Sequence, residues 1–163
     1  MKYLVFILLI SFNVSAQISP GDLTSAHSNL EGLSNCTKCH EIGEKVLSSK
    51  CLDCHKEIKE LINSNRGYHS SSEVKKKECA SCHNEHHGRN FRIVSFNPDA
   101  FDHDKTGFDL TGAHKQIKCY DCHQSKFIST DKYKKKKKTY LGLDTKCISC
   151  HKDFHQGTLG KNC

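Results

Sequence analysis

The sequence has few of the residues from which a soluble protein builds its core. It contains no tryptophan, and Met1 is the only methionine. Hydrophobic residues make up 36% of the chain, mean hydropathy is −0.63, and the apolar N-terminal segment raises both values. Beyond that segment, apolar residues occur singly or in short runs such as residues 91–94 (FRIV). A chain of this composition is not expected to fold well without additional support.

Cysteine and histidine, in contrast, are abundant, with eleven and twelve residues. Ten of the eleven cysteines fall in five copies of Cys-x-x-Cys-His. Such pairs occur in zinc ribbons, redox-active dithiols and covalent haem sites. A zinc ribbon has no need of a histidine directly after each pair, whereas haem attachment explains all three positions. The repeat therefore favours haem over the two alternatives.

In a haem site of this kind, two thiols on one helical turn add to the vinyl groups of one porphyrin, and the adjacent imidazole binds the iron. The motifs predict five complete haem c sites, and at this density the cofactors would form the core. The predicted attachment residues are Cys36, Cys39, Cys51, Cys54, Cys79, Cys82, Cys119, Cys122, Cys147 and Cys150. The predicted proximal iron ligands are His40, His55, His83, His123 and His151.

The N-terminus reads as a secretory signal peptide covering residues 1–16. Lys2 is followed by an apolar stretch from Tyr3 to Phe12, and residues 14–16 (VSA) resemble a cleavage site that ends at Ala16. The apolar stretch is shorter than the roughly twenty residues of a membrane span, so an uncleaved anchor is the less favoured alternative. Export to the periplasm agrees with haem attachment, which takes place outside the cytoplasm in bacteria.

The formal charge of +7 raises the possibility of an acidic partner. Loss of the signal peptide removes Lys2, and each haem brings two propionates, so the holoprotein would be close to neutral or mildly acidic. Nucleic acid is therefore not expected as a partner, and any membrane contact would be at most peripheral. The basic run Lys132–Lys138 is either a solvated loop or a docking patch for an acidic redox partner protein.

The spacing of the motifs suggests two haem modules, residues 17–92 with three motifs and residues 93–163 with two. The interval between His83 and Cys119 is the longest, and it contains a predicted turn at residues 97–99 (NPD). Cys163 lies 16 residues after Cys147, which is similar to the 15-residue step between the first two motifs. We therefore expect Cys163 to begin a truncated sixth haem motif, with a free terminal thiol as the alternative.

The expected fold is mostly irregular with short α-helices and very little β structure, in the manner of haem-cored multihaem cytochromes c. Short helices should carry the motifs, and residues 57–62 (EIKELI) form the clearest helical segment. Residues 91–96 (FRIVSF) alternate in part between apolar and polar side chains and predict a strand.

Each haem iron needs a ligand opposite its proximal histidine. Methionine cannot fill this position once the signal peptide is removed, because Met1 leaves with it. Any single histidine outside the motifs is more simply a surface residue, but the set favours bis-histidine coordination. The seven are His27, His69, His86, His87, His103, His114 and His155.

Residues 101–123 (FDHDKTGFDLTGAHKQIKCYDCH) resemble the class III multihaem cytochromes c, which are periplasmic electron carriers. The segments 82–88 (CHNEHHG) and 150–157 (CHKDFHQG) are also similar to this family. The resemblance implies distal ligands a few residues before or after a motif, and His87 is a possible substitute for His86. The distal iron candidates are His27, His69, His86, His103, His114 and His155. These six match five haems and the inferred sixth.

With every sixth position filled by histidine, no iron is open to a substrate. The sequence therefore favours an electron carrier that passes single electrons along a chain of haems over an enzyme. The alternative is the electron-feeding part of a larger multihaem oxidoreductase that reduces nitrogen or sulfur oxyanions at an open haem.

Overall fold

The computed structural model describes residues 20–41, 43, 45–136 and 139–158. The expected signal peptide, Lys137, Lys138 and Cys163 lie outside the described residues. Within the described ranges the backbone is mostly irregular, with short helices and almost no β structure, which confirms that part of the expected fold. None of the helices in these ranges has the length and apolar character to cross a bilayer.

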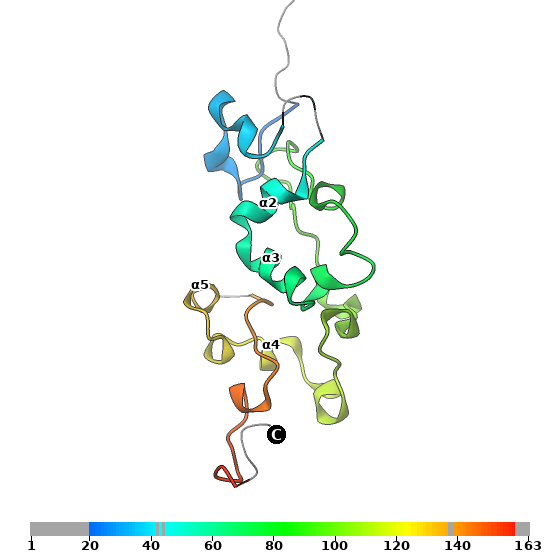
Figure 1. The fold of residues 1–163 in the computed structure, drawn as a ribbon, viewed down its shortest axis with the longest axis vertical. Coiled ribbons are helices and arrows are strands. Elements are labelled where there is room, and N and C mark those ends of the chain that lie inside the picture. The colour runs from blue at the N-terminus through cyan, green and yellow to red at the C-terminus, as the bar shows by residue number, and fades with distance from the viewer. Residues whose placement is uncertain (1–19, 42, 44, 137–138, 159–163) are drawn as a thin grey trace, which may run out of the picture. The chain divides into compact units, whose positions relative to one another are not determined.

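The chain divides into two compact units (Figure 1). Unit 1 contains the residues up to Asn63 together with Ser72–Phe96, and unit 2 contains Ser64–Ser71 together with the residues from Asn97 onward. The first three motifs fall in unit 1 and the last two in unit 2. The sequence-based division lies between residues 92 and 93, and the second unit takes in the additional short segment Ser64–Ser71.

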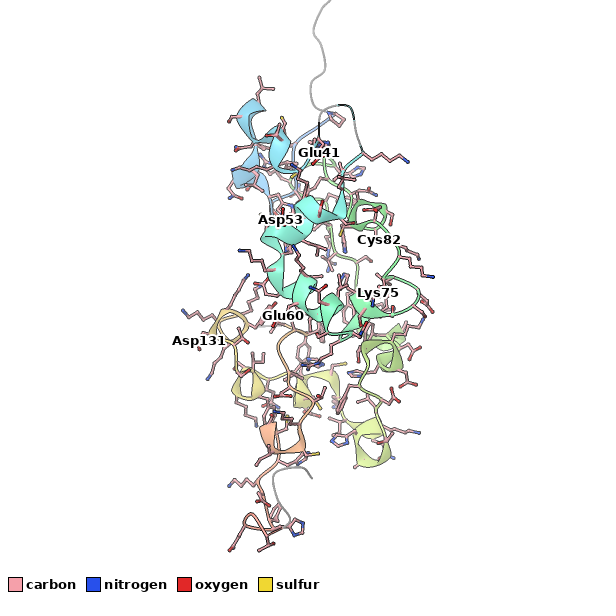
Figure 2. The ribbon with its side chains drawn as sticks, in the orientation of Figure 1. Glu41, Asp53, Glu60, Lys75, Cys82 and Asp131 are labelled. Carbon is pink, nitrogen blue, oxygen red and sulfur yellow. The ribbon has the colours of Figure 1, made fainter. Side chains whose placement is uncertain are left out.

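Unit 1 contains two consecutive α-helices, α2 (Ser48–Cys54) and α3 (Lys56–Asn63), and Figure 2 labels Asp53 on the first and Glu60 on the second. The predicted helical segment 57–62 lies within α3, which is confirmed. Its apolar residues Ile58, Leu61 and Ile62 recur at the three- and four-residue spacing that places them on one helical face. The 3₁₀-helices of this unit are η2 (Ser28–Leu30), η3 (Leu33–Lys38) and η5 (Cys79–Ser81).

Unit 2 consists of short helical turns joined by loops. The predicted turn at residues 97–99 is confirmed. The Asn97 side chain accepts a hydrogen bond from the Asp99 N–H. Pro98 occupies the first helical position, where a backbone N–H would have no partner within the helix, so its absence costs nothing. Its helical segments are η4 (Tyr68–Ser70), η6 (Pro98–Ala100), η7 (His103–Thr106), η8 (Gly112–Gln116), α4 (Cys119–Cys122), η9 (Ser125–Phe127), α5 (Asp131–Lys134) and η10 (Cys147–Ser149).

The predicted strand at residues 91–96 is wrong. This segment is extended or bent without pairing, and the β pairing found among the described residues is one isolated antiparallel bridge between Ile128 and Leu143. A strand needs a neighbour for its backbone groups. Here the Ile93 carbonyl accepts its hydrogen bond from the side chain of His83 instead, at 2.9 Å.

Few apolar side chains are buried. Among the described residues, Ile128 and Tyr133 are the buried hydrophobic ones, with 2% and 7% of their surface exposed. Large apolar side chains remain in contact with solvent, including Leu33 at 70% and Phe154 at 88% exposed. In an ordinary monomer, side chains of this kind gather in a contiguous core.

The small buried cluster of unit 2 depends on Gly142. Its φ is +94°, and a Cβ there would lie 2.9 Å from Ile128 Cγ2 and 3.0 Å from Tyr133 Cδ2. We expect Gly142→Ala to destabilise this cluster by about 1–3 kcal/mol, through both the backbone conformation and the clash. Hydrogen exchange of the amides around Tyr133 measures it. Gly157→Ala is the control, because its φ is +81° but its Cβ would meet no atom within 4 Å. Equal destabilisation by the two substitutions would show that the clash with Ile128 and Tyr133 does not contribute.

Candidate functional site

All five Cys-x-x-Cys-His motifs fold into the same backbone turn. In each, the N–H of the histidine donates to the carbonyl of the first cysteine at 2.8–2.9 Å. Because one turn separates these residues, both thiols and the imidazole are carried on a single turn. α2 and α4 contain both cysteines of the second and fourth motifs. In the other three motifs the first cysteine lies in a 3₁₀-helix and the second caps its C-terminal end. The repeat is therefore a structural one as well as a repeat in sequence.

Four of the cysteines have raised pKa values. None of the ten described cysteines is in a disulfide. Burial raises the pKa of Cys51 to about 11 and, as the main cause, raises those of Cys39, Cys122 and Cys150. Cysteines that take part in thiol redox chemistry have lowered pKa values because the thiolate is the active form. These environments therefore do not favour the dithiol interpretation.

The structure brings predicted ligand residues together in unit 1. The ring of His27 faces that of His55, with centroids 5.9 Å apart, and the ring of His86 faces that of His40 at 6.1 Å. In each pair one histidine belongs to a motif and the other does not. Neither non-motif histidine is adjacent in sequence to the motif that it faces.

Unit 2 repeats the arrangement. His103 faces His123 with ring centroids 6.5 Å apart, and His114 faces His151 at 5.9 Å. His114 stands five residues before the fourth motif but lies against the histidine of the fifth. Four of the five motif histidines are thus opposed by an imidazole from outside the motifs.

The non-motif rings in three of these pairs are held by their Nδ1 atoms. His86 Nδ1 lies 2.8 Å from the Gly21 carbonyl, and His103 Nδ1 lies 2.7 Å from the Phe108 carbonyl. His27 Nδ1 lies 2.5 Å from a carboxylate oxygen of Glu85. Carbonyl and carboxylate oxygens only accept, so Nδ1 carries the proton in each case, and Nε2 of the neutral ring keeps its lone pair.

The backbone of His86 is in the left-handed region, with φ of +68°. Few non-glycine residues adopt this conformation, and it is concentrated at functional positions. Gly21 approaches so closely that a Cβ there would lie 2.6 Å from the His86 carbonyl oxygen. His87, the predicted substitute, instead packs on Phe91 with ring centroids 4.5 Å apart. The structure therefore places His86, and not His87, opposite His40.

The half-buried surroundings of His123 change the pKa of its imidazole. Burial lowers its pKa, with the neighbouring His103 as a second cause. The ring of Tyr140 lies 5.1 Å from that of His123, and the Tyr140 hydroxyl donates to Tyr120 at 2.9 Å. A lowered pKa keeps the imidazole neutral, which is the form that binds a metal.

For three more of the predicted ligand residues, the structure shows contacts with groups other than histidine. His83 donates from Nδ1 to the Ile93 carbonyl at 2.9 Å, so its Nε2 also keeps its lone pair. His69 lies in η4, with its ring 6.1 Å from that of Tyr68. His155 is exposed in a turn whose N–H groups donate to Asp153.

Glu85 and Thr24 are joined by hydrogen bonds beside His27, and the sequence analysis identified neither of them as a site residue. Both Thr24 N–H and the Thr24 hydroxyl donate to the carboxylate that holds His27. Burial raises the pKa of Glu85, but hydrogen bonds from Thr24 and His27 outweigh it and leave the pKa lowered. The sequence did offer one signal for Glu85. It stands two residues after the third motif, and acids also stand shortly after other motifs.

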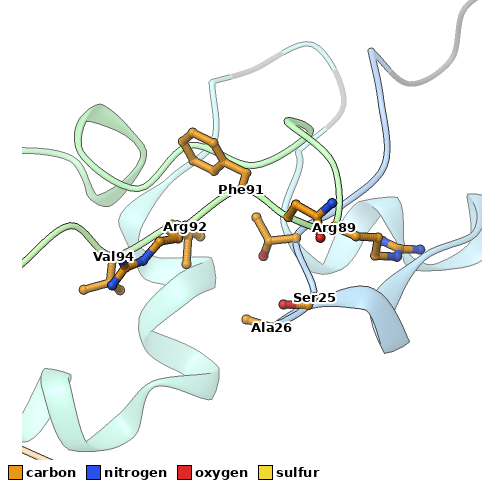
Figure 3. Close-up of a pocket in the computed structure, with 9 residues that line it drawn as sticks. Ser25, Ala26, Arg89, Phe91, Arg92 and Val94 are labelled. Atoms are coloured by element: carbon orange, nitrogen blue, oxygen red, sulfur yellow. The ribbon is translucent and has the colours of Figure 1, made fainter.

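A hollow of about 430 Å³ lies beside this cluster, between residues 24–26 and residues 89–94 (Figure 3). It is lined by Phe91, Ile93 and Val94 together with Arg89 and Arg92. The Arg89 guanidinium is already paired with Glu31.

The site contains paired imidazoles rather than a compact cluster. Across the described ranges, no group of three or more His, Cys, Asp or Glu side chains is placed to hold a metal ion. Comparison with known proteins finds no matching family model, no matching curated protein and no matching solved structure.

Proposed function

We propose that this protein is an exported, periplasmic multihaem c-type cytochrome that carries single electrons along a chain of bis-histidine haems. The proposal rests on the sequence repeat and on the way in which the fold opposes the imidazoles.

The single observation that carries the proposal is the set of four opposed pairs, with ring centroids 5.9–6.5 Å apart. Each pair would supply one iron with two imidazole ligands, one from a motif and one from outside the motifs. Ordinary aromatic packing covers the same range. Packing alone, however, gives no reason for every pair to combine one motif histidine with one non-motif histidine.

The near absence of a polypeptide core also supports the proposal. Few chains of this size are stable with only two buried hydrophobic side chains among the residues that the structure describes. Covalent haems would give the exposed Leu33, Phe91 and Ile148 an apolar surface to cover. The ten described cysteines outside disulfides, in a chain proposed to be exported, are explained in the same way, as thioether attachment points.

Each part of the chain then has a defined task. The cysteines would attach the group, and the motif and non-motif histidines would supply imidazole nitrogens to the iron. When bound, haem supplies a one-electron iron couple. In the four opposed pairs, two imidazoles would leave no position on the iron for a substrate, so this arrangement favours transfer of electrons over catalysis.

For the redox partner, the exposed basic residues around α5 provide the docking surface. Tyr133 is buried and anchors α5, whereas Lys132, Lys134 and Lys135 are exposed. A lysine cluster steers association with an acidic partner surface and makes that association depend on salt.

Mass and spin state test the proposed function. The intact mass of the mature holoprotein should exceed that of the polypeptide by five haems, which should survive acid-acetone extraction. Electron paramagnetic resonance of the oxidised protein should be dominated by low-spin ferric signals, because two imidazoles create a strong ligand field. Bound zinc without a Soret band would refute the proposal. A large high-spin fraction would favour the enzyme alternative.

A further inference from the structure

Glu85 connects two segments of unit 1 that are far apart in sequence. Its Oε2 accepts from the Thr24 N–H at 2.7 Å, and its Oε1 accepts from the Thr24 hydroxyl at 2.8 Å and from His27 Nδ1 at 2.5 Å. Thr24 is only 1% exposed, which makes it the most buried side chain among the described residues. The carboxylate is therefore held in one place by two contacts from Thr24 besides the one from His27.

The surrounding contacts attach the same two segments independently of Glu85. The Gly88 N–H donates to the Asp22 carbonyl at 3.0 Å, and the Arg89 guanidinium donates to the Leu23 carbonyl at 2.6 Å and pairs with Glu31. A conservative change at Glu85 is thus expected to leave residues 22–31 in place. The role of the carboxylate can then be separated from the role of the fold.

We infer that Glu85 is a positioning residue for His27, which it fixes as the distal ligand of the iron whose proximal ligand is His55. This inference rests on the proposed function. The carboxylate holds Nδ1 of the His27 ring, whose centroid lies 5.9 Å from that of His55, and leaves Nε2 as the nitrogen that would bind the iron.

The type of acceptor distinguishes this site from the others. His86 and His103 donate to backbone carbonyls, whereas His27 donates to a carboxylate. An anionic acceptor draws the Nδ1 proton more strongly and makes the imidazole a more basic ligand. A more basic ligand stabilises ferric over ferrous iron, so the second-motif haem has a lower reduction potential than it would with a carbonyl acceptor.

The first test is Glu85→Gln, which removes the charge and keeps one oxygen to accept from His27 Nδ1, while its amide nitrogen takes the place of Oε2 beside the Thr24 N–H. A redox titration followed by electron paramagnetic resonance should show one haem in five moving to a higher potential, with all five haems still attached and low-spin. Thr24→Val should move the same haem in the opposite direction, because the hydroxyl no longer shares Oε1 with His27. Opposite shifts from two changes that each weaken the link between Glu85 and Thr24 are not expected from a purely structural role.

Glu78→Gln is the matched control. The Glu78 carboxylate accepts from the Ser48 N–H at 3.1 Å at the start of α2, which carries the second motif, but no described hydrogen bond joins it to a histidine. This change should leave all five potentials in place. Five low-spin haems with unchanged potentials in Glu85→Gln would overturn the inference, as would an equal shift in Glu78→Gln. Failure of the proposed function is a different result, since wild-type protein would then lack the five haems.

Discussion

His114→Ala should convert one haem in five from low-spin to high-spin while all five remain attached. His114 faces His151, and the attachment residues Cys147 and Cys150 are untouched, so the opened iron belongs to the fifth motif. Ferric electron paramagnetic resonance measures the spin state, and added cyanide or carbon monoxide should bind to about one fifth of the haem. Packing around η8 should also loosen, because the ligand bond joins two chain segments.

His87→Ala is the control for this experiment. His87 packs on Phe91, whereas the neighbouring His86 faces His40, so its loss should leave every iron six-coordinate. If His114→Ala stayed fully low-spin while His87→Ala opened a site, the assignment of distal ligands would be incorrect. The electron-transfer proposal would survive that result, but the pairing in unit 2 would not.

The mature chain produced without haem attachment should fail to fold. The described residues bury only Ile128 and Tyr133 as hydrophobic side chains, which is far too little to balance the conformational entropy of the chain. We expect no cooperative thermal transition by circular dichroism and rapid digestion by proteases. The holoprotein should show both a cooperative transition and protection from digestion.

Ile128→Ala in the holoprotein gives the complementary measurement. Truncation of a buried isoleucine commonly costs about 2–5 kcal/mol. If the haems form the main core, this change should lower the stability of the holoprotein locally but leave all five haems bound and low-spin. A haem-free chain that unfolded cooperatively would show that the polypeptide has a sufficient core of its own.

Local features were predictable from the sequence because they depend on neighbouring residues. The helix at residues 57–62 follows from the spacing of Ile58, Leu61 and Ile62 on one face. The turn at Pro98 follows from the fixed φ of proline and the capping side chain of Asn97. The failed strand at residues 91–96 shows the limit of this reasoning, because pairing needs a partner strand and Ile93 is bonded to His83 instead.

The sequence by itself determined which residue types the site contains: five repeated motifs and a surplus of histidines. It could not determine which histidine opposes which motif, because distance along the chain does not predict the pairing. His27 precedes the first motif but faces His55 of the second, and His86 follows the third motif but faces His40 of the first. Only the tertiary structure decided these pairs, since long-range contacts such as those of Glu85 with Thr24 and His27 bring distant segments together.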